Sequence, residues 1–294
     1  MSDKYHDTVA ASKVISDDAA VDAAVKKIID EHFDENNNVD VYRFLFNTID
    51  LTTLKATDSP QSVAAFTERV NAFEEEYPEL PNVAAICVYP NFAQIVRTVL
   101  DVSEVDVACV SGGFPSSQTF TEVKIAETAL AVDGGADEID IVLNVGNFLD
   151  GDYEEVCDEI AEQKTACRDA RLKVILETGA LKTAENIKAA SVLALYSGAD
   201  FLKTSTGKEF PGASLEATYV MCQAIKEYYE KTGTRVGFKA AGAVATTADA
   251  VKYYTIVKEV LGEEWLTNEY FRLGASRLAN NLLGDILGKE IKFF

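Results

Sequence analysis

The sequence predicts a single (β/α)8 barrel with an N-terminal helical extension. The chain has 294 residues, which suits one such barrel. From residue 41 onward, eight short apolar runs alternate with segments of helical spacing. Eight strand–helix units favour a closed barrel, and an open doubly wound sheet is the alternative. We therefore expect an acidic helical extension over residues 1–40 and a barrel domain over residues 41–294.

The eight predicted strands are short and mostly rich in Val, Ile, Leu or Phe. This composition is typical of parallel strands that are buried on both faces. In chain order, the strands are expected at residues 47–51, 83–89, 106–111, 138–144, 172–178, 201–204, 236–241 and 271–274.

Helical spacing marks the segments between these runs. Apolar residues recur every three or four positions over 123–130, 156–167 and 187–194. Thr246 and Asp249 form the pattern of a capping box that opens another helix.

The first forty residues have a different character. Residues 14–33 predict one or two acidic, Ala-rich helices, and residues 35–38 predict a turn or linker. We expect these helices either to cap the bottom of the barrel or to contact a second subunit.

The composition excludes several classes of partner and site. A formal charge of −21, from 48 acidic and 27 basic residues, disfavours binding to nucleic acid or to an anionic membrane. No apolar run is long enough for a membrane span, and the N-terminus lacks a signal-peptide core. Five cysteines without a Cys-x-x-Cys pair argue against disulfides and fit a reducing cytoplasm. Because the chain has only two histidines, we expect no metal site and no histidine base.

Two lysines, Lys203 and Lys239, stand at the downstream ends of two predicted strands. A buried ammonium is costly to desolvate, so packing does not explain them. A lysine amine can form a Schiff base with a carbonyl substrate. A second cation about 4 Å away would lower the pKa of such a lysine by roughly three units. We therefore expect one lysine to activate the other, with Asp140 balancing the residual charge and relaying protons.

The active site of this fold lies at the carboxyl ends of the strands. Alternation along the strands selects charged residues for the inward faces, and outward ion pairs with the helices are the alternative. The residues selected in this way are Asp140, Lys173, Glu177, Lys203 and Lys239. Asp50, at the end of the first strand, is expected to take part in substrate binding.

An anion site is expected in the loops that follow the last three strands. Glycines allow a ligand to approach the backbone closely, and a helix N-terminus binds phosphate. Loops after strands seven and eight often hold phosphate in this fold. The residues expected there are Gly207, Lys208, Gly242, Gly274 and Ser276.

Five long motifs, in this order, resemble those of the deoxyribose-phosphate aldolases. They occupy residues 137–142, 172–179, 199–208, 236–242 and 271–276, and residues 50–54 and 85–90 are similar to that family's first two strands. The resemblance extends from about residue 45 to residue 285. It implies a class I aldolase on a (β/α)8 barrel that needs no metal or organic cofactor. The implied reaction is reversible cleavage of 2-deoxy-D-ribose 5-phosphate to acetaldehyde and D-glyceraldehyde 3-phosphate, a step in deoxynucleoside breakdown.

The resemblance also implies roles for individual residues. Lys203 would form the Schiff base, Lys239 would lower its pKa, and Asp140 would transfer protons with Lys239 and a water. The five residues of the expected anion site would bind the substrate and its phosphate. Cys87 matches a cysteine near the family's active site, although a small core residue is an equal interpretation. The family also suggests a homodimer.

The sequence departs from the family pattern at two places. The loop after the seventh strand reads Gly242-Ala243-Val244-Ala245, so Ala245 stands where an arginine is common. Arg277 follows Ser276 where a second serine is common. We expect either that phosphate binding is weaker or that Arg277 replaces the lost charge and binds the phosphate. The alternatives are a class I aldolase with a different or non-phosphorylated acceptor, and a barrel that binds ligands without catalysis.

Overall fold

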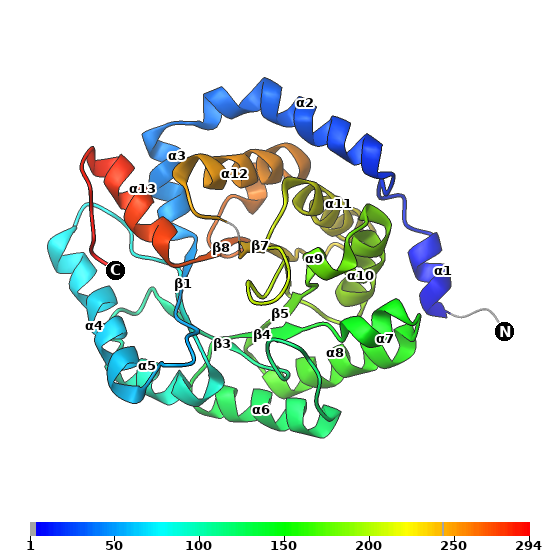
Figure 1. Ribbon diagram of the computed structural model, residues 1–294, viewed down its shortest axis with the longest axis horizontal. Helices are drawn as coiled ribbons and strands as arrows, with labels where there is room; N and C mark the ends of the chain where they lie inside the picture. Colours follow the sequence, from blue (N-terminus) through cyan, green and yellow to red (C-terminus); the bar gives the residue numbers. More distant parts are fainter. Residues whose placement is uncertain (1–3, 243) are drawn as a thin grey trace.

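A computed structural model describes residues 4–242 and 244–294, which form a closed barrel of eight parallel strands (Figure 1). The strands follow one another around the barrel in chain order, and the last pairs with the first. This arrangement confirms the predicted barrel, and the open sheet is wrong. The strands are β1 (Ile49–Thr52), β2 (Ala85–Val88), β3 (Asp106–Val110), β4 (Glu138–Val142), β5 (Arg171–Ile175), β6 (Phe201–Lys203), β7 (Gly237–Ala241) and β8 (Phe271–Ala275).

Helices between the strands form the outer ring. The capping box predicted at Thr246 is confirmed, because its hydroxyl accepts a hydrogen bond from the Asp249 amide at 3.1 Å. These elements are α4 (Pro60–Glu76), η1 (Pro90–Phe92), α5 (Ala93–Val99), α6 (Thr121–Asp133), α7 (Val145–Leu149), α8 (Tyr153–Cys167), α9 (Thr178–Leu181), α10 (Ala184–Tyr196), α11 (Leu215–Thr232), α12 (Thr247–Leu261), η2 (Glu263–Trp265) and α13 (Arg277–Leu287). None of the helices in the described part of the chain is long and apolar enough to cross a membrane.

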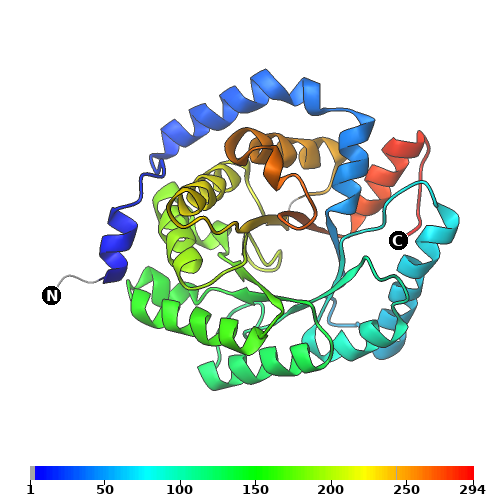
Figure 2. The same ribbon diagram turned by 180° about the vertical axis from the view of Figure 1, so that it is seen from behind.

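Three helices precede the first strand: α1 (Lys4–Ala10), α2 (Asp18–Asn36) and α3 (Val39–Asn47). Figures 1 and 2 show α2 along the outside of α11 and α12, so a cap across the barrel bottom is wrong. The contact buries Val21 and Val25, and Ile28, Ile29 and Phe33 also pack against the core, which explains why this acidic helix stays on the barrel. At its end, the Asn36 amide donates to Thr255 Oγ1 at 3.2 Å.

The inside of the barrel is divided into an apolar and a charged part. Small side chains from β2 and β3 (Ala85, Cys87, Ala108 and Val110) form an apolar cluster with Leu54, which follows β1. The main hydrophobic core lies between the strands and the helices. The charged part of the interior is built by β1, β4, β5, β6, β7 and β8, and it contains the candidate site.

Candidate active site

Seven ionisable side chains are buried within the barrel. None of them is more than 4% exposed. The carboxylates are Asp50, Glu138 and Asp140, and the cations are Lys173, Lys203, Lys239 and Arg272. They pair with one another across the interior, so the alternative of outward ion pairs with helices is wrong for Asp140, Lys173, Lys203 and Lys239.

The two lysines singled out by the sequence meet at one carboxylate. Lys203 and Lys239 are register partners on β6 and β7. Each Nζ lies 2.7 Å from the same oxygen, Asp140 Oδ2. The other Asp140 oxygen accepts a hydrogen bond from Lys173 Nζ at 3.1 Å. Three lysines therefore surround one buried carboxylate.

A second layer of charges supports this group from below. Asp50 is ion-paired with Lys239 and accepts a hydrogen bond from Arg272 Nη1 at 2.7 Å. Arg272 Nη2 lies 3.1 Å from Glu138 Oε1, and Glu138 is also ion-paired with Lys173. Asp50 is therefore a partner of Lys239 beneath the site, and it does not line the cavity described below.

Sequence reasoning missed Glu138 and Arg272, although a signal for both was present. Glu138 lies two residues before Asp140, and Arg272 lies two residues before Gly274. Residues two apart on a strand share a face, so Glu138 and Arg272 should have been predicted on the inward faces of β4 and β8.

Burial is the largest cause that lowers the pKa of Lys203, and the charge of Lys239 lowers it further. The Asp140 carboxylate opposes both effects but does not reverse them. Repulsion from Lys239 therefore contributes, but it is not the main cause that we expected from the sequence. The pKa of Lys239 is raised, because the attraction of Asp140 and Asp50 outweighs burial. The neighbouring lysines hold the pKa of Asp140 well below its ordinary value, although burial opposes them.

The balance of buried charges explains why the pKa of Lys203 is lowered and that of Lys239 is raised. Without Lys203, the buried network contains three carboxylates and three cations. A charged Lys203 would add one uncompensated cation, which is costly in a desolvated site. Lys203 is therefore the amine that loses its proton most readily.

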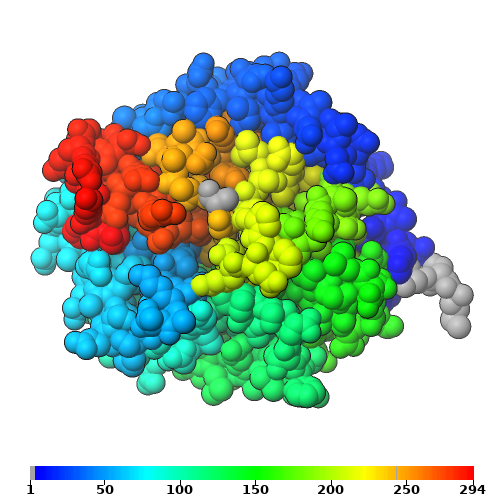
Figure 3. All heavy atoms as spheres, in the orientation of Figure 1, coloured from blue at the N-terminus to red at the C-terminus, as the bar shows by residue number. Residues whose placement is uncertain are grey.

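A cavity of about 710 Å³ opens at the carboxyl ends of the strands. Lys203 lines this cavity, whereas Lys239 and Asp140 lie beneath its lining. The predicted anion-site residues also line it, together with Arg277: they are Gly207, Lys208, Gly242, Gly274 and Ser276. In Figure 3 the yellow residues after β6 and the orange-to-red residues after β7 and β8 crowd this face.

Two glycines allow the loops after β6 and β7 to touch. Gly207 and Gly242 have φ values of +72° and +87°. A Cβ on Gly207 would lie 3.2 Å from the Gly242 Cα, and a Cβ on Gly242 would lie 3.0 Å from the Gly207 Cα. Larger residues would force these loops apart, so both positions require glycine for conformation and for space.

The expected departures from the family pattern lie at the cavity. Ala245 and Arg277 both line it, and the Arg277 side chain is exposed. Arg277 begins α13, directly after Ser276. Ala243 lies outside the described residues.

Alternation along β5 predicted that Glu177 lies on the inward face of that strand, and this prediction is wrong. The strand ends at Ile175, and Glu177 has a left-handed backbone with φ 55° and ψ 57°. Its buried carboxylate accepts a hydrogen bond from the Thr206 amide at 3.2 Å and another from the Thr206 hydroxyl. Burial raises the pKa of Glu177. The apolar run continues past Ile175, so the sequence carried no signal of this turn.

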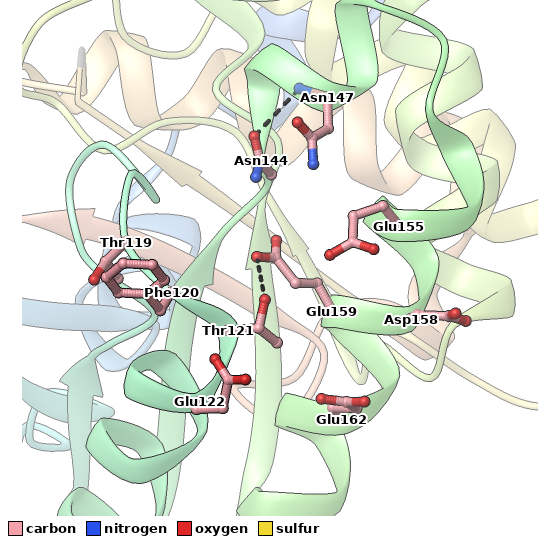
Figure 4. A pocket seen from close by; sticks show the side chains of 10 residues that line it. All are labelled: Thr119, Phe120, Thr121, Glu122, Asn144, Asn147, Glu155, Asp158, Glu159 and Glu162. Atoms are coloured by element: carbon pink, nitrogen blue, oxygen red, sulfur yellow. Dashed lines mark hydrogen bonds between the residues drawn. The ribbon is translucent and has the colours of Figure 1, made fainter.

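A second hollow, on the outer side of the barrel between α6 and α8, is acidic (Figure 4). It has a volume of about 530 Å³, and its lining includes Glu122, Glu155, Asp158, Glu159 and Glu162. None of the described lysines lines it, and Lys124 nearby is buried in an ion pair with Glu159. This hollow therefore lacks the accessible amine that Schiff-base chemistry requires.

Among the described residues, one cluster of histidine and carboxylates has the spacing of metal ligands. It consists of His32, Glu35 and Glu259, on α2 and α12. Both glutamates already contact the histidine ring, with His32 Nδ1 3.1 Å from Glu35 Oε1 and Nε2 3.6 Å from Glu259 Oε2. None of the three residues lines the cavity at the barrel mouth.

Several known proteins to which this chain is similar are aldolases. Residues 45–266 match a family model described as DeoC/LacD family aldolase. A Caenorhabditis elegans protein, provisionally named as a deoxyribose-phosphate aldolase, is 43% identical over 84% of this chain and 82% of its own length. The human deoxyribose-phosphate aldolase is 39% identical over 80% of this chain and 77% of its own length. A crystal structure from Coccidioides immitis, provisionally given the same name, is 31% identical, with a TM-score of 0.67 over 81% of this chain and 85% of that one.

Proposed function

The chain belongs to the DeoC/LacD family of aldolases, and from that premise we propose that it cleaves 2-deoxy-D-ribose 5-phosphate reversibly into D-glyceraldehyde 3-phosphate and acetaldehyde. As an aldolase it is a carbon–carbon lyase. One observation carries the proposed mechanism: of the three lysines around Asp140, only Lys203 lines the cavity and only Lys203 has a lowered pKa.

In this mechanism Lys203 is the nucleophile. Its neutral amine attacks the C1 aldehyde of the open-chain sugar, and loss of water gives a protonated imine. The imine draws electrons from the C2–C3 bond, which breaks as the C3 hydroxyl loses its proton and becomes the aldehyde of D-glyceraldehyde 3-phosphate. An enamine of acetaldehyde remains on Lys203. Protonation of the enamine at C2 and hydrolysis then release acetaldehyde and regenerate the amine.

Asp140 and Lys239 are the proposed proton-transfer group. Their shared contact with Lys203 supports this role, because a proton moves readily along hydrogen bonds of 2.7 Å. A water in the cavity would carry the proton between this pair and C2. In the resting enzyme the raised pKa of Lys239 favours its charged form, which also lowers the pKa of Lys203. The proposed chemistry uses only side chains, and we propose no metal or organic cofactor.

The phosphate is proposed to bind at Gly207, Lys208, Gly242, Gly274 and Ser276, with Arg277 in place of the missing arginine. The first N–H groups of α13, which follow Ser276, are unpaired within the helix and favour an anion. Lys208 and Arg277 supply positive charge on the same cavity. This local charge counteracts the −21 net charge of the chain.

Turnover of two substrates tests the proposal. The purified protein should cleave 2-deoxy-D-ribose 5-phosphate, measured as acetaldehyde release, with a KM well below that for 2-deoxy-D-ribose. A second candidate, a class I aldolase for a non-phosphorylated acceptor, is favoured by Ala245 on the cavity wall. Equal kcat/KM values for the two sugars would select that candidate and reject the phosphorylated substrate.

We also propose where the enzyme works and with what it associates. Its partners would be small molecules in the cytoplasm, with no nucleic acid, and it would form a homodimer. Four free, buried cysteines (Cys87, Cys109, Cys167 and Cys222) and the acidic charge support a reducing compartment without nucleic-acid binding. Residues 1–40 would be an extension of a catalytic domain over 41–294. Sedimentation equilibrium tests the dimer, and a monomer mass would reject it.

A further inference from the structure

Glu177 lies in an unusual backbone conformation between β5 and α9. Its φ of 55° falls in the left-handed region, which costs a non-glycine residue roughly 1–2 kcal/mol. The side chain is 3% exposed. A buried carboxylate on a strained backbone persists only where other contacts hold it in place.

The contacts of Glu177 join it to the loop that lines the cavity. One carboxylate oxygen accepts from the Thr206 amide at 3.2 Å, and the other accepts from the Thr206 hydroxyl. The Thr206 hydroxyl oxygen in turn accepts a hydrogen bond from the Lys208 amide at 3.2 Å. A continuous chain of hydrogen bonds therefore runs from Glu177 through Thr206 to Lys208, and both loop residues line the cavity.

The backbone around Glu177 supports both ends of the same loop. The Leu176 amide donates to the Lys203 carbonyl, and the Thr178 amide donates to the Thr204 carbonyl, both at 2.9 Å. A Cβ on Gly179 would lie 2.4 Å from the Pro211 carbonyl oxygen, so the far end of the loop also packs here. Residues 176–179 thus form a rigid support, and Glu177 supplies its side-chain contact with the middle of the loop.

We propose that Glu177 is a positioning residue that fixes Thr206, Gly207 and Lys208 in the conformation that binds the phosphate of the substrate. This inference rests on the proposed function and deepens it. Glu177 acts through Thr206 and does not itself line the cavity. The carboxylate suits this task because it offers two acceptor oxygens to two donors of one residue. A glutamine side chain has one acceptor oxygen, and its NH₂ group would face the amide or the hydroxyl of Thr206, which are donors to Glu177.

Three variants test the inference: Glu177→Gln, Thr206→Val and Glu209→Gln. Thr206→Val removes the hydroxyl but leaves Glu177 in place. Glu209→Gln is the matched control, because it makes the same charge change within the loop that Glu177 contacts, at an exposed residue outside the cavity lining. The measurements are KM and kcat for 2-deoxy-D-ribose 5-phosphate and for 2-deoxy-D-ribose, together with the melting temperature.

We expect Glu177→Gln and Thr206→Val each to raise KM for the phosphorylated sugar about tenfold, which is the size of one lost hydrogen bond to a charged group. KM for 2-deoxy-D-ribose and kcat should stay within about twofold, and Glu209→Gln should match the wild type. The double variant should be no worse than the poorer single variant, because both changes break one contact. If Glu177→Gln does not fold, Thr206→Val decides the question alone.

Unchanged KM values in both variants, equal increases for the two sugars, or a fall in kcat alone would overturn the positioning role. In all of these cases a wild type that cleaves the phosphorylated sugar leaves the proposed function intact. A wild type that cleaves neither sugar rejects the proposed function and this inference together.

Discussion

Lys203 and Lys239 are register partners on adjacent strands and donate to the same oxygen of Asp140 at the same distance, 2.7 Å. Their remaining surroundings differ. Lys239 has a second carboxylate partner, Asp50, and lies beneath the cavity, whereas Lys203 faces the cavity. The pKa of Lys203 is therefore lowered and that of Lys239 is raised. The lysine that faces the cavity is therefore the one whose charged form is disfavoured.

The first prediction concerns the amine of Lys203. Lys203→Arg keeps a long side chain that can donate a hydrogen bond to Asp140 but removes the nucleophile, so kcat should fall by about 10⁴-fold or more. Acetaldehyde release measures the loss, and circular dichroism checks that the variant is folded. Activity above one hundredth of the wild type (about 2.7 kcal/mol) in a folded variant would contradict the role of Lys203.

The second prediction concerns the pH dependence of the reaction. The kcat/KM value reports ionisations of the free enzyme, and its acid limb should follow the pKa of Lys203. Lys239→Met removes a cation that lowers this pKa, so the acid limb should move to higher pH and kcat should also fall. A pH–rate profile of both proteins measures the shift. An acid limb at the same or a lower pH would show that Lys239 does not tune Lys203.

The third prediction concerns stability and Lys203. Its pKa is lower in the folded protein than in the unfolded chain. Between these two pKa values the unfolded chain holds more protons, so this residue makes the free energy of unfolding rise with pH. That contribution is complete only above the unfolded pKa of about 10.4.

The Lys203→Met variant lacks this contribution. The stability of the wild type relative to Lys203→Met should therefore increase with pH, by up to about 1.4 kcal/mol per pH unit. Because the pKa of Lys239 is raised, this residue makes the free energy of unfolding fall with pH above the pKa of the unfolded chain. Lys239 is present in both proteins, so its contribution is common to both. Urea unfolding at several pH values from 7 to about 10 measures the difference. A difference that is constant or decreases with pH is inconsistent with a lowered pKa.

The fourth prediction concerns the phosphate site. Arg277→Ala should raise KM for 2-deoxy-D-ribose 5-phosphate about tenfold or more, because an Arg–phosphate contact is charge-assisted. KM for 2-deoxy-D-ribose should remain nearly unchanged. Ala245→Arg adds a cation to the cavity lining and should lower KM for the phosphorylated sugar. Equal effects of Arg277→Ala on both sugars would eliminate Arg277 as a phosphate ligand.

The fifth prediction compares how much a buried ion-pair network and an exposed ion pair contribute to the free energy of unfolding. Arg272 contacts Asp50, Glu138 and Asp106 and is 2% exposed. Arg272→Met leaves buried carboxylates uncompensated, so the free energy of unfolding should fall by about 3–5 kcal/mol. Arg168→Met breaks the exposed pair with Asp133 and should cost less than about 1 kcal/mol. Equal losses in urea titrations would refute the structural role of Arg272.

Much of the fold follows from local patterns in the sequence. Each observed strand overlaps a predicted apolar run, because strands that are buried on both faces of a parallel sheet are mostly apolar. The capping box at Thr246 is equally local. The place of α2 was not predictable, because it depends on the surfaces of α11 and α12, which only the folded barrel brings together.

The candidate site was predictable in part. Lys203, Lys239 and Asp140 are conspicuous as charges in apolar runs, and strand alternation places them inside. The shared contact at Asp140 Oδ2 depends on the stagger of strands around the closed barrel, which no local pattern encodes. Glu177 was assigned to a strand because nothing in its neighbours marks a left-handed turn.

The central claim is that Lys203 is the amine that bonds to the substrate. Incubation of the protein with acetaldehyde and borohydride, followed by peptide mass mapping, should find an added ethyl group on Lys203 alone. Lys173 and Lys239 should remain unmodified, because both lie beneath the cavity and their pKa values are raised. An ethyl group on Lys239, or on any lysine in place of Lys203, would contradict the account.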